Sequence, residues 1–372
     1  MSTIAAVILW FAITCYVVLG GADYGAGFWD LTAGGARRGA RPRALIDQAM
    51  TPVWEANNVW LIFALVVLWT AFPRAFASIM SALFVPMSLA AGGIVLRGAA
   101  FVFRKPIQAL TGRRILGAAF ALSSVVTPFF LGAAFGGIAS GRIRAGDPGG
   151  DPAAAWTGPT SMLIGTLAVV CAAFLAAVFL VFDARRARDQ ALEHYFRRRA
   201  MGSAAVAGLV AVAGLFVLRG DAPYLFHGLL RQGLPLVLIS AACGGGVLAL
   251  LSRRITRGTR GLAVGAVVAV LAGWGLAQYP YLLPTSLTIQ AGAGAPATLT
   301  WVLVVFLAAA VTAVPALGLL YVLDQRGHLQ EAATEAPQEP VQEPIVHRGA
   351  VGTKRDRSPT ARPHWWRRAF GR

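Results

Sequence analysis

The chain has 372 residues, of which 57% are hydrophobic and 13% charged, and its formal net charge is +17. A soluble domain of this length carries about twice that charged fraction, so the composition predicts an all-α integral membrane protein. The basic residues occur in clusters between apolar runs and form no continuous basic face, which excludes nucleic acid as an expected partner.

Nine segments are long and apolar enough to cross a bilayer, since a spanning helix needs about 20 residues. They lie at about 4–22, 52–72, 77–101, 115–138, 158–182, 200–218, 233–251, 261–279 and 299–323. We expect residues 1–325 to form one membrane domain of nine transmembrane helices, arranged as two four-helix bundles plus one peripheral helix. No convincing cleavage site follows the first segment, which is therefore expected to be a retained span.

Eight connections join these segments, and the number of lysine and arginine residues alternates between high and low from one connection to the next. The odd-numbered connections and the C-terminal tail hold 27 of the 33 basic residues, the even-numbered connections hold five, and Arg97 falls inside the third segment. The positive-inside rule then predicts that the odd connections and the C-terminus face the cytoplasm and that the N-terminus lies outside. Because one missed or extra span would break this alternation, it also supports the count of nine.

The composition changes after residue 325. Residues 331–343 are rich in Glu, Pro and Gln, and the end of the chain holds Trp365 and Trp366 among basic residues. We expect residues 326–372 to form a cytoplasmic, disordered, basic tail. Its end would rest on anionic membrane lipid, with Trp at the interface and Arg against phosphate. A solvated tail that only assists topology is an equal alternative.

Two carboxylates, Asp23 and Glu55, lie in or beside the first two apolar segments. An ionisable group at membrane depth costs roughly 2.5–3.5 kcal/mol on insertion scales, so such a group is usually retained to carry charge or protons or to hold a partner. The predicted topology places both acids near the cytoplasmic ends of their helices, at the same depth as Arg97 of the third segment.

Glu55 belongs to a polar heptad at the start of an apolar run, Trp54-Glu55-Ala56-Asn57-Asn58-Val59-Trp60. On a helix, Glu55 and Asn58 are i, i+3 neighbours. An amide both donates and accepts hydrogen bonds, so a carboxylate beside it can exchange protons through water. The sequence therefore predicts a proton pathway through Glu55, Asp23 and Asn58. The expected structural or charge partners are Arg97, Trp54, Asn57 and Trp60.

A purely structural interpretation of the same residues stays open. Glu55 and Arg97 would then form a buried ion pair that joins the second and third helices. Asp23, which stands beside Gly25 and Gly27, would cap a helix break.

The sequence offers no ligands for a haem or a metal inside the membrane. Such a site needs His, Cys or Met side chains at mid-span, and none of the five histidines lies there. The three cysteines fall inside apolar runs with spacings that fit neither a metal site nor a disulfide framework. No phosphate-binding loop or dinucleotide fingerprint is present. We expect this chain to bind no cofactor and to be one component of a larger assembly.

Several of these stretches resemble subunit II of the cytochrome bd ubiquinol oxidase family. They are Gly21-Ala22-Asp23-Tyr24-Gly25-Ala26-Gly27, Pro52–Leu61, Ala71-Phe72-Pro73, Val95-Leu96-Arg97-Gly98 and the Tyr279–Ser286 segment. The resemblance extends from residue 1 to about residue 325 and includes the number of spans. The basic tail lies outside the family pattern.

The resemblance implies the haem-free subunit of a terminal quinol oxidase in a bacterial plasma membrane. Subunit I of that family holds haem b and haem d, oxidises quinol and reduces O2 to water. Subunit II is its structural homologue and heterodimer partner, and a small accessory subunit is possible. In the family, the acid at the position of Glu55 lines a proton entry path from the cytoplasm, and Asp23 matches the aspartate of the first motif. Some members carry a second acid a few residues earlier, where Gly20 and Gly21 stand here.

A different class of protein is the main alternative: a proton-coupled secondary transporter that uses Asp23 and Glu55 as coupling carboxylates. Transporters often carry inverted repeats and helices interrupted near the midplane. This chain has no evident repeat, and both acids are expected near one face. A third possibility is an assembly partner with no role in proton transfer.

Overall fold

The computed structural model describes the chain except for residues 36, 51–53, 105–109, 147–150, 152 and 326–372. It contains two compact units, Met1–Leu320 and Tyr321–Arg372. The expected tail, residues 326–372, lies outside the described residues, so its disorder and its position remain predictions.

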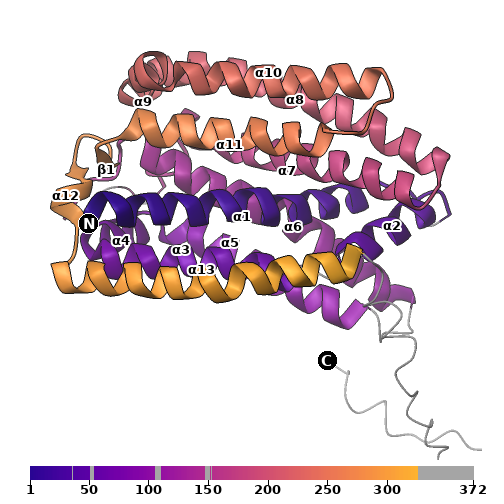
Figure 1. Ribbon diagram of the computed structural model, residues 1–372, viewed down its shortest axis with the longest axis horizontal. Helices are drawn as coiled ribbons and strands as arrows, with labels where there is room; N and C mark the ends of the chain where they lie inside the picture. Colours follow the sequence, from indigo (N-terminus) through magenta and orange to yellow (C-terminus); the bar gives the residue numbers. More distant parts are fainter. Residues whose placement is uncertain (36, 51–53, 105–109, 147–150, 152, 326–372) are drawn as a thin grey trace, which may run out of the picture. The chain divides into compact units, whose positions relative to one another are not determined.

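Long helices that run side by side make up the first unit (Figure 1). Their bounds are α1 Ser2–Leu31, α3 Trp54–Ala71, α5 Phe84–Arg104, α6 Leu110–Ala139, α7 Pro159–Arg186, α8 Gln190–Asp221, α10 Leu234–Ser252, α11 Thr259–Gln278 and α13 Pro296–Gln325. Shorter elements connect them: α2 Ala40–Met50, α4 Pro73–Ala82, α9 Pro223–Gly228, the π-helical turn η1 Leu229–Gly233, the antiparallel strands β1 Tyr281–Leu283 and β2 Leu287–Thr288, and α12 Ile289–Gly292.

Within the described part of the chain, eight helices are long and apolar enough to cross a membrane, and the number rises to nine if the bent pair of α3 and α4 is one span. The predicted all-α membrane fold is therefore confirmed, with eight or nine candidate spans among the described residues against the nine expected. The short elements α4 and α12 lie at the N-terminal end of α1, and α2 lies at its opposite end (Figure 1).

The long helices form two groups. In the second half of the chain, α7 packs on α8, α8 on α10, α10 on α11 and α11 again on α7, which closes a four-helix bundle. In the first half, α1 packs on α3 and α6, and α5 packs on α6. The groups meet where α7 contacts α1 and α6. The first turns of α13 cover α1 and α3 from outside, with the Phe306 ring 6.4 Å from that of Phe11 and 5.9 Å from that of Phe63.

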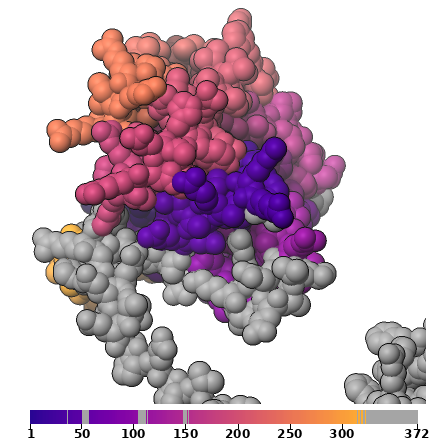
Figure 2. Space-filling view, turned by 90° about the vertical axis from the view of Figure 1, so that its right-hand side faces the viewer, coloured from indigo at the N-terminus to yellow at the C-terminus, as the bar shows by residue number. Residues whose placement is uncertain are grey.

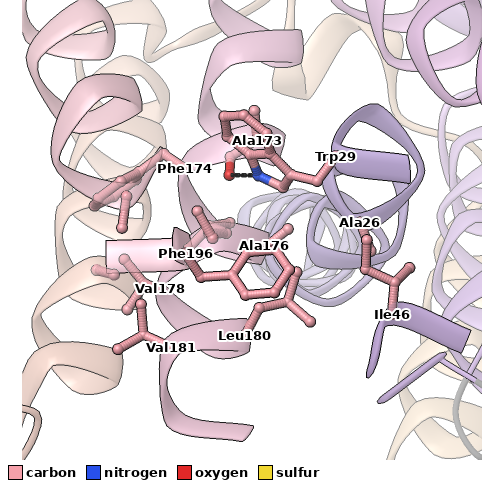
Figure 3. Close-up of a cluster of buried hydrophobic side chains, with 14 of the residues drawn as sticks. Ala26, Trp29, Ile46, Ala173, Phe174, Ala176, Val178, Leu180, Val181 and Phe196 are labelled. Atoms are coloured by element: carbon pink, nitrogen blue, oxygen red, sulfur yellow. Dashed lines mark hydrogen bonds between the residues drawn. The ribbon is translucent and has the colours of Figure 1, made fainter. Parts of the chain in front are cut away.

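The largest apolar core lies where α7 passes between α1 and α8 (Figure 3). Trp29 of α1 and Phe196 of α8 both belong to this core, and Trp29 Nε1 donates a hydrogen bond of 2.8 Å to the Ala173 carbonyl. Helices in lipid associate by close packing and not by exclusion of water. The many alanines on α7 allow that approach, because they add little side-chain bulk at the contact.

The first predicted segment, 4–22, ends too early. The glycine-rich stretch after residue 19 is typical of a helix end, but α1 continues without a break to Leu31. The glycines are needed for packing instead: a Cβ on Gly25 would lie 1.9 Å from the Ala172 carbonyl oxygen of α7. A tertiary contact has thus overridden the local signal.

The third predicted segment, 77–101, contains a break. The short helix α4 ends at Ala82, and α5 begins at Phe84. The axis of α4 is bent by 119° from that of α3. Pro73 explains the bend, because its ring has no N–H to continue the hydrogen bonds of α3 and its fixed φ suits the first position of a new helix.

Candidate functional site

The candidate site is a buried polar cluster around Asp23, inside α1. The helix continues for eight residues beyond Asp23, about 12 Å at 1.5 Å per residue. The Asp23 residue is only 9% exposed. Because the helix is unbroken here, Asp23 cannot be the cap of a helix break, and that structural alternative is excluded.

Asn57 of α3 holds the carboxylate directly. Its Nδ2 donates to Asp23 Oδ2 at 2.5 Å and to the Leu19 carbonyl oxygen at 3.3 Å. A primary amide has two hydrogens and can make both bonds at once. Asn57 therefore satisfies one oxygen of the acid and fastens α3 to α1 at this depth.

Arg97 of α5 lies beside the same turn of α1. Its Nη2 donates to the Asp23 backbone carbonyl at 2.8 Å, and its Nη1 donates to Ser124 Oγ on α6. The guanidinium carbon lies 4.7 Å from the ring centroid of Tyr24 and 4.6 Å from that of Phe120. Arg97 is 6% exposed, so these charge-assisted bonds and cation–π contacts replace its lost hydration.

A glycine makes room for this arrangement. A Cβ on Gly27 would lie 2.1 Å from Ser124 Oγ and 3.0 Å from Arg97 Nη1. Ser124 in turn donates to the Phe120 carbonyl at 2.6 Å. Glycine is therefore required one helical turn beyond Asp23, so that α5 and α6 can bring their polar groups against α1.

Two tyrosines extend the cluster along α1. The hydroxyl oxygens of Tyr16 and Tyr24 are 3.1 Å apart, and both residues are buried. A pair of hydroxyls can pass a proton in either direction, because each can donate or accept. The cluster thus combines a carboxylate, an amide, a guanidinium and three hydroxyls within one helix group.

The structure brings together three of the sequence-predicted residues, Asp23, Asn57 and Arg97. Asn58 is half-buried on α3, and half-buried Trp60 packs edge to face on Phe11 with ring centroids 5.8 Å apart. Trp54 and Glu55 form the start of α3, but their side chains lie outside what the structure describes. The predicted role of Glu55, and its alternative ion pair with Arg97, are therefore untested.

Sequence reasoning missed the hydroxyl groups. Tyr16 precedes Asp23 by seven residues, which places both on one face of a helix, so that spacing was a usable signal. Ser124 carried no such signal, because nothing in a single sequence tells which hydroxyl of the fourth segment meets the arginine of the third.

The sequence did not indicate a second buried acid, Asp30, because the predicted first segment ends at residue 22. It follows Asp23 by seven residues and lies in the last turn of the helix. Arg43 Nε donates to Asp30 Oδ1 at 2.8 Å, and the Asp30 side chain is 5% exposed. This ion pair ties the end of α1 to α2.

The donor set of the cluster does not suit a haem or a metal. Its described members include no His, Cys or Met side chain that could serve as a haem ligand. Across the described residues, no group of three or more His, Cys, Asp or Glu side chains could hold a metal ion. The arrangement suits the holding of charge or the movement of protons.

A family model matches residues 1–324, and its description is cytochrome bd terminal oxidase subunit II. A putative cytochrome bd menaquinol oxidase subunit II of Bacillus subtilis (strain 168) is 23% identical over 314 residues, which cover 79% of this chain and 87% of the relative. The cytochrome bd-I ubiquinol oxidase subunit 2 of Escherichia coli (strain K12) is 29% identical over 126 residues, which cover 34% of this chain and 32% of the relative.

A solved structure is similar over most of the chain. It is described as the structure of bd oxidase from Geobacillus thermodenitrificans, and the likeness has a TM-score of 0.71 at 26% sequence identity. The matched region covers 87% of this chain and 98% of the other.

Proposed function

The chain belongs to the cytochrome bd terminal oxidase subunit II family, and from this membership we propose the part that it plays in the complex. It is a multi-pass membrane subunit of a quinol oxidase complex with a partner subunit I. The resemblance seen in the sequence is thereby confirmed. The similarity extends over residues 1–324, and it gives no support to the alternative of a secondary transporter.

The proposed role is to support the reduction of O2 in subunit I by scaffolding and by proton uptake from the cytoplasm. Glu55 and Asn58 form the entry, and Asp23 lies further in. Arg97, Asn57, Trp54 and Trp60 position these groups. Haem b and haem d belong to subunit I, and the substrate of the complex is a quinol.

The observation that carries this proposal is the bond between Asn57 and Asp23. It joins the polar start of α3 to an acid buried inside an unbroken apolar helix. Burying an ionisable acid at membrane depth is costly, so such a group is usually paired with another residue or has a function in moving charge or protons. Asn57 and Asn58 are adjacent, so their side chains leave the helix about 100° apart. One amide thus holds Asp23, while the side chain of the next leaves the helix toward the neighbouring face.

The topology proposed for the chain follows from its loop charges. The α2 end of the helices, which carries the arginine-rich turns, faces the cytoplasm of a bacterial plasma membrane. The N-terminus then lies outside and the C-terminus inside. A small accessory subunit and bound membrane lipid complete the proposed assembly.

The test compares Glu55→Gln with Glu55→Asp in the complete oxidase. The Gln variant should assemble and keep its haem bands in a reduced-minus-oxidised spectrum, yet consume O2 several-fold more slowly, because it has no proton to exchange. The Asp variant should retain most activity. A Gln variant that consumes O2 at the native rate would show that Glu55 has no role in proton uptake.

A further inference from the structure

The turn between α7 and α8 and the turn between α10 and α11 lie at one end of the helix unit, the end that faces the viewer in Figure 2, and each carries exposed arginines. The turn between α7 and α8 holds Arg185, Arg186 and Arg188, and the turn between α10 and α11 holds Arg253, Arg254 and Arg257. We name these six residues the arginine face. The two turns are in contact, because Arg185 Nη1 donates to Thr256 Oγ1 at 2.5 Å.

The nearby carboxylates do not balance this charge. Two carboxylates lie beside these six arginines: Asp183 pairs with Arg260 at 2.6 Å, and Asp189 pairs with Arg41 at 2.5 Å. Asp189 also accepts a hydrogen bond from the Leu192 N–H as the cap of α8. A net excess of exposed positive charge therefore remains at this end of the molecule.

Two of the arginines occupy positions where the backbone favours glycine. Arg188 has a φ of 55° and Arg254 a φ of 60°. Each follows a helix end with the same pair of hydrogen bonds. At the end of α7, the Arg188 N–H bonds to the Arg185 carbonyl at 3.0 Å, and the next N–H bonds to the Ala184 carbonyl at 3.0 Å. The end of α10 repeats this pattern at 3.1 and 2.9 Å.

Helices that end in this way usually have glycine at the left-handed position. The chain does use glycine at the next positive φ in the same turn, Gly258 at 83°. Arginine at both helix ends is thus less favourable for the backbone than glycine, and its positive charge is what glycine would lack. The helix dipole attracts cations, but Arg185 and Arg253 already supply charge there without strain.

Apolar side chains stand beside these charges. Phe182 is 37% exposed and Ile255 is 42% exposed, next to the two turns. Exposed arginine adjoining exposed apolar groups, at the ends of membrane-spanning helices, matches the boundary between lipid phosphates and acyl chains. Guanidinium groups bind phosphate in a bidentate way.

We propose that the arginine face binds the phosphates of anionic phospholipid, with Arg188 and Arg254 as its central contacts. The occupant is a lipid headgroup at the membrane surface, which is anionic on the cytoplasmic side. This inference is independent of the proposed proton pathway and would stand if Glu55 had no function.

The double variant R188G/R254G tests the proposal in the complete oxidase. Glycine suits both backbone positions, so thermal stability in nanodiscs of phosphatidylcholine should stay equal or rise. Retention of cardiolipin in native mass spectrometry should fall about tenfold, because two charges near the surface are lost. The rise in thermal stability that cardiolipin gives to the native oxidase should shrink as well.

The matched control is R144Q, because exposed Arg144 lies on a connection at the other end of the helices. It should keep native cardiolipin retention. The variant R188N/R254N, in which asparagine also tolerates a positive φ, provides a second test if the glycine variant assembles poorly. Unchanged retention in both double variants, or an equal loss in R144Q, would overturn the proposal.

Discussion

Gly25 and Gly27 decide how closely α1 approaches its neighbours. A Cβ at Gly25 would meet backbone of α7 at 1.9 Å, and one at Gly27 would meet Ser124 Oγ at 2.1 Å. No real contact is that short, so either substitution must move a helix. These two glycines therefore set the positions of Asp23 and Arg97 as firmly as the hydrogen bonds do.

Gly25→Ala should lower the free energy of unfolding of the complex by about 1–3 kcal/mol, the usual cost of overpacking, and its melting temperature should fall. Gly202→Ala on α8 is the control, because no atom of this chain would lie within 4 Å of a Cβ at that position. Alanine at such an exposed helical site should be neutral or slightly stabilising. Equal melting temperatures for the two variants would contradict the packing role of Gly25.

The bond between Asn57 and Asp23 can be measured with a double-mutant cycle. Asn57→Ala leaves a buried carboxylate oxygen without its donor, so it should cost about 1.5–3 kcal/mol of stability. In an Asp23→Ala background the same change should cost much less, since the oxygen is gone. Thermal unfolding of the four proteins gives the coupling, and a coupling near zero would mean that the two side chains do not interact.

The polar residues of this site could be selected from the sequence, but their pairing could not. Asp23, Asn57 and Arg97 stand out because each interrupts an apolar run. The ion pair of Arg97 with Glu55, left open by the sequence, stays untested, and the described bonds of Arg97 go to a backbone carbonyl and to Ser124, which the sequence did not indicate. Such partners depend on helix rotation and depth, which tertiary packing decides.

At the scale of elements, the helix count was predictable and the helix ends were not. Span number follows from hydropathy and from the alternation of loop charge, both of which repeat along the whole chain. The end of α1 depends instead on single contacts, such as that of Trp29 with the Ala173 carbonyl of α7. The bend before α4 had a local signal in Pro73, which the continuous apolar pattern concealed.

The start of α8 should respond to acid. Asp189 caps this helix, and the backbone hydrogen bond from Leu192, followed by the bond and charge of Arg41, lowers the pKa of Asp189 below its ordinary value of 3.8. A carboxyl group with a lowered pKa stabilises the fold above its unfolded pKa and loses this contribution as the pH falls through the folded value.

Asp189→Asn should therefore lower the melting temperature at neutral pH and leave a smaller loss of stability as the pH falls below about 4. Arg41→Gln should weaken the same dependence only in part, because the backbone bond remains. If the Asn variant and the native complex show the same pH dependence of melting, the charge of Asp189 does not stabilise the fold.

At the scale of the whole molecule, the chain exposes large apolar side chains on its long helices. Leu209 and Phe216 of α8 are 70% and 73% exposed, and Trp301 of α13 is 66% exposed. Lipid and a partner subunit are the natural neighbours of such surfaces. Under the proposal above, the haems and the redox chemistry of the complex belong to subunit I.

The chain produced without subunit I should therefore give membranes with no b-type or d-type haem bands in a reduced-minus-oxidised spectrum. The two subunits produced together should restore both bands. Haem bands that co-purify with this chain alone would contradict the assignment of the haems to subunit I.

The unbroken course of α1 also limits how the gene can change. One inserted residue between Tyr16 and Asp23 would turn everything on one side of it by about 100°. Asp23 would leave Asn57, Gly25 would leave the backbone of α7, and Trp29 would lose its carbonyl. We expect this helix to accept substitutions at its lipid-facing positions but neither the gain nor the loss of a residue, so its length is fixed by side-chain phase and not by membrane thickness alone.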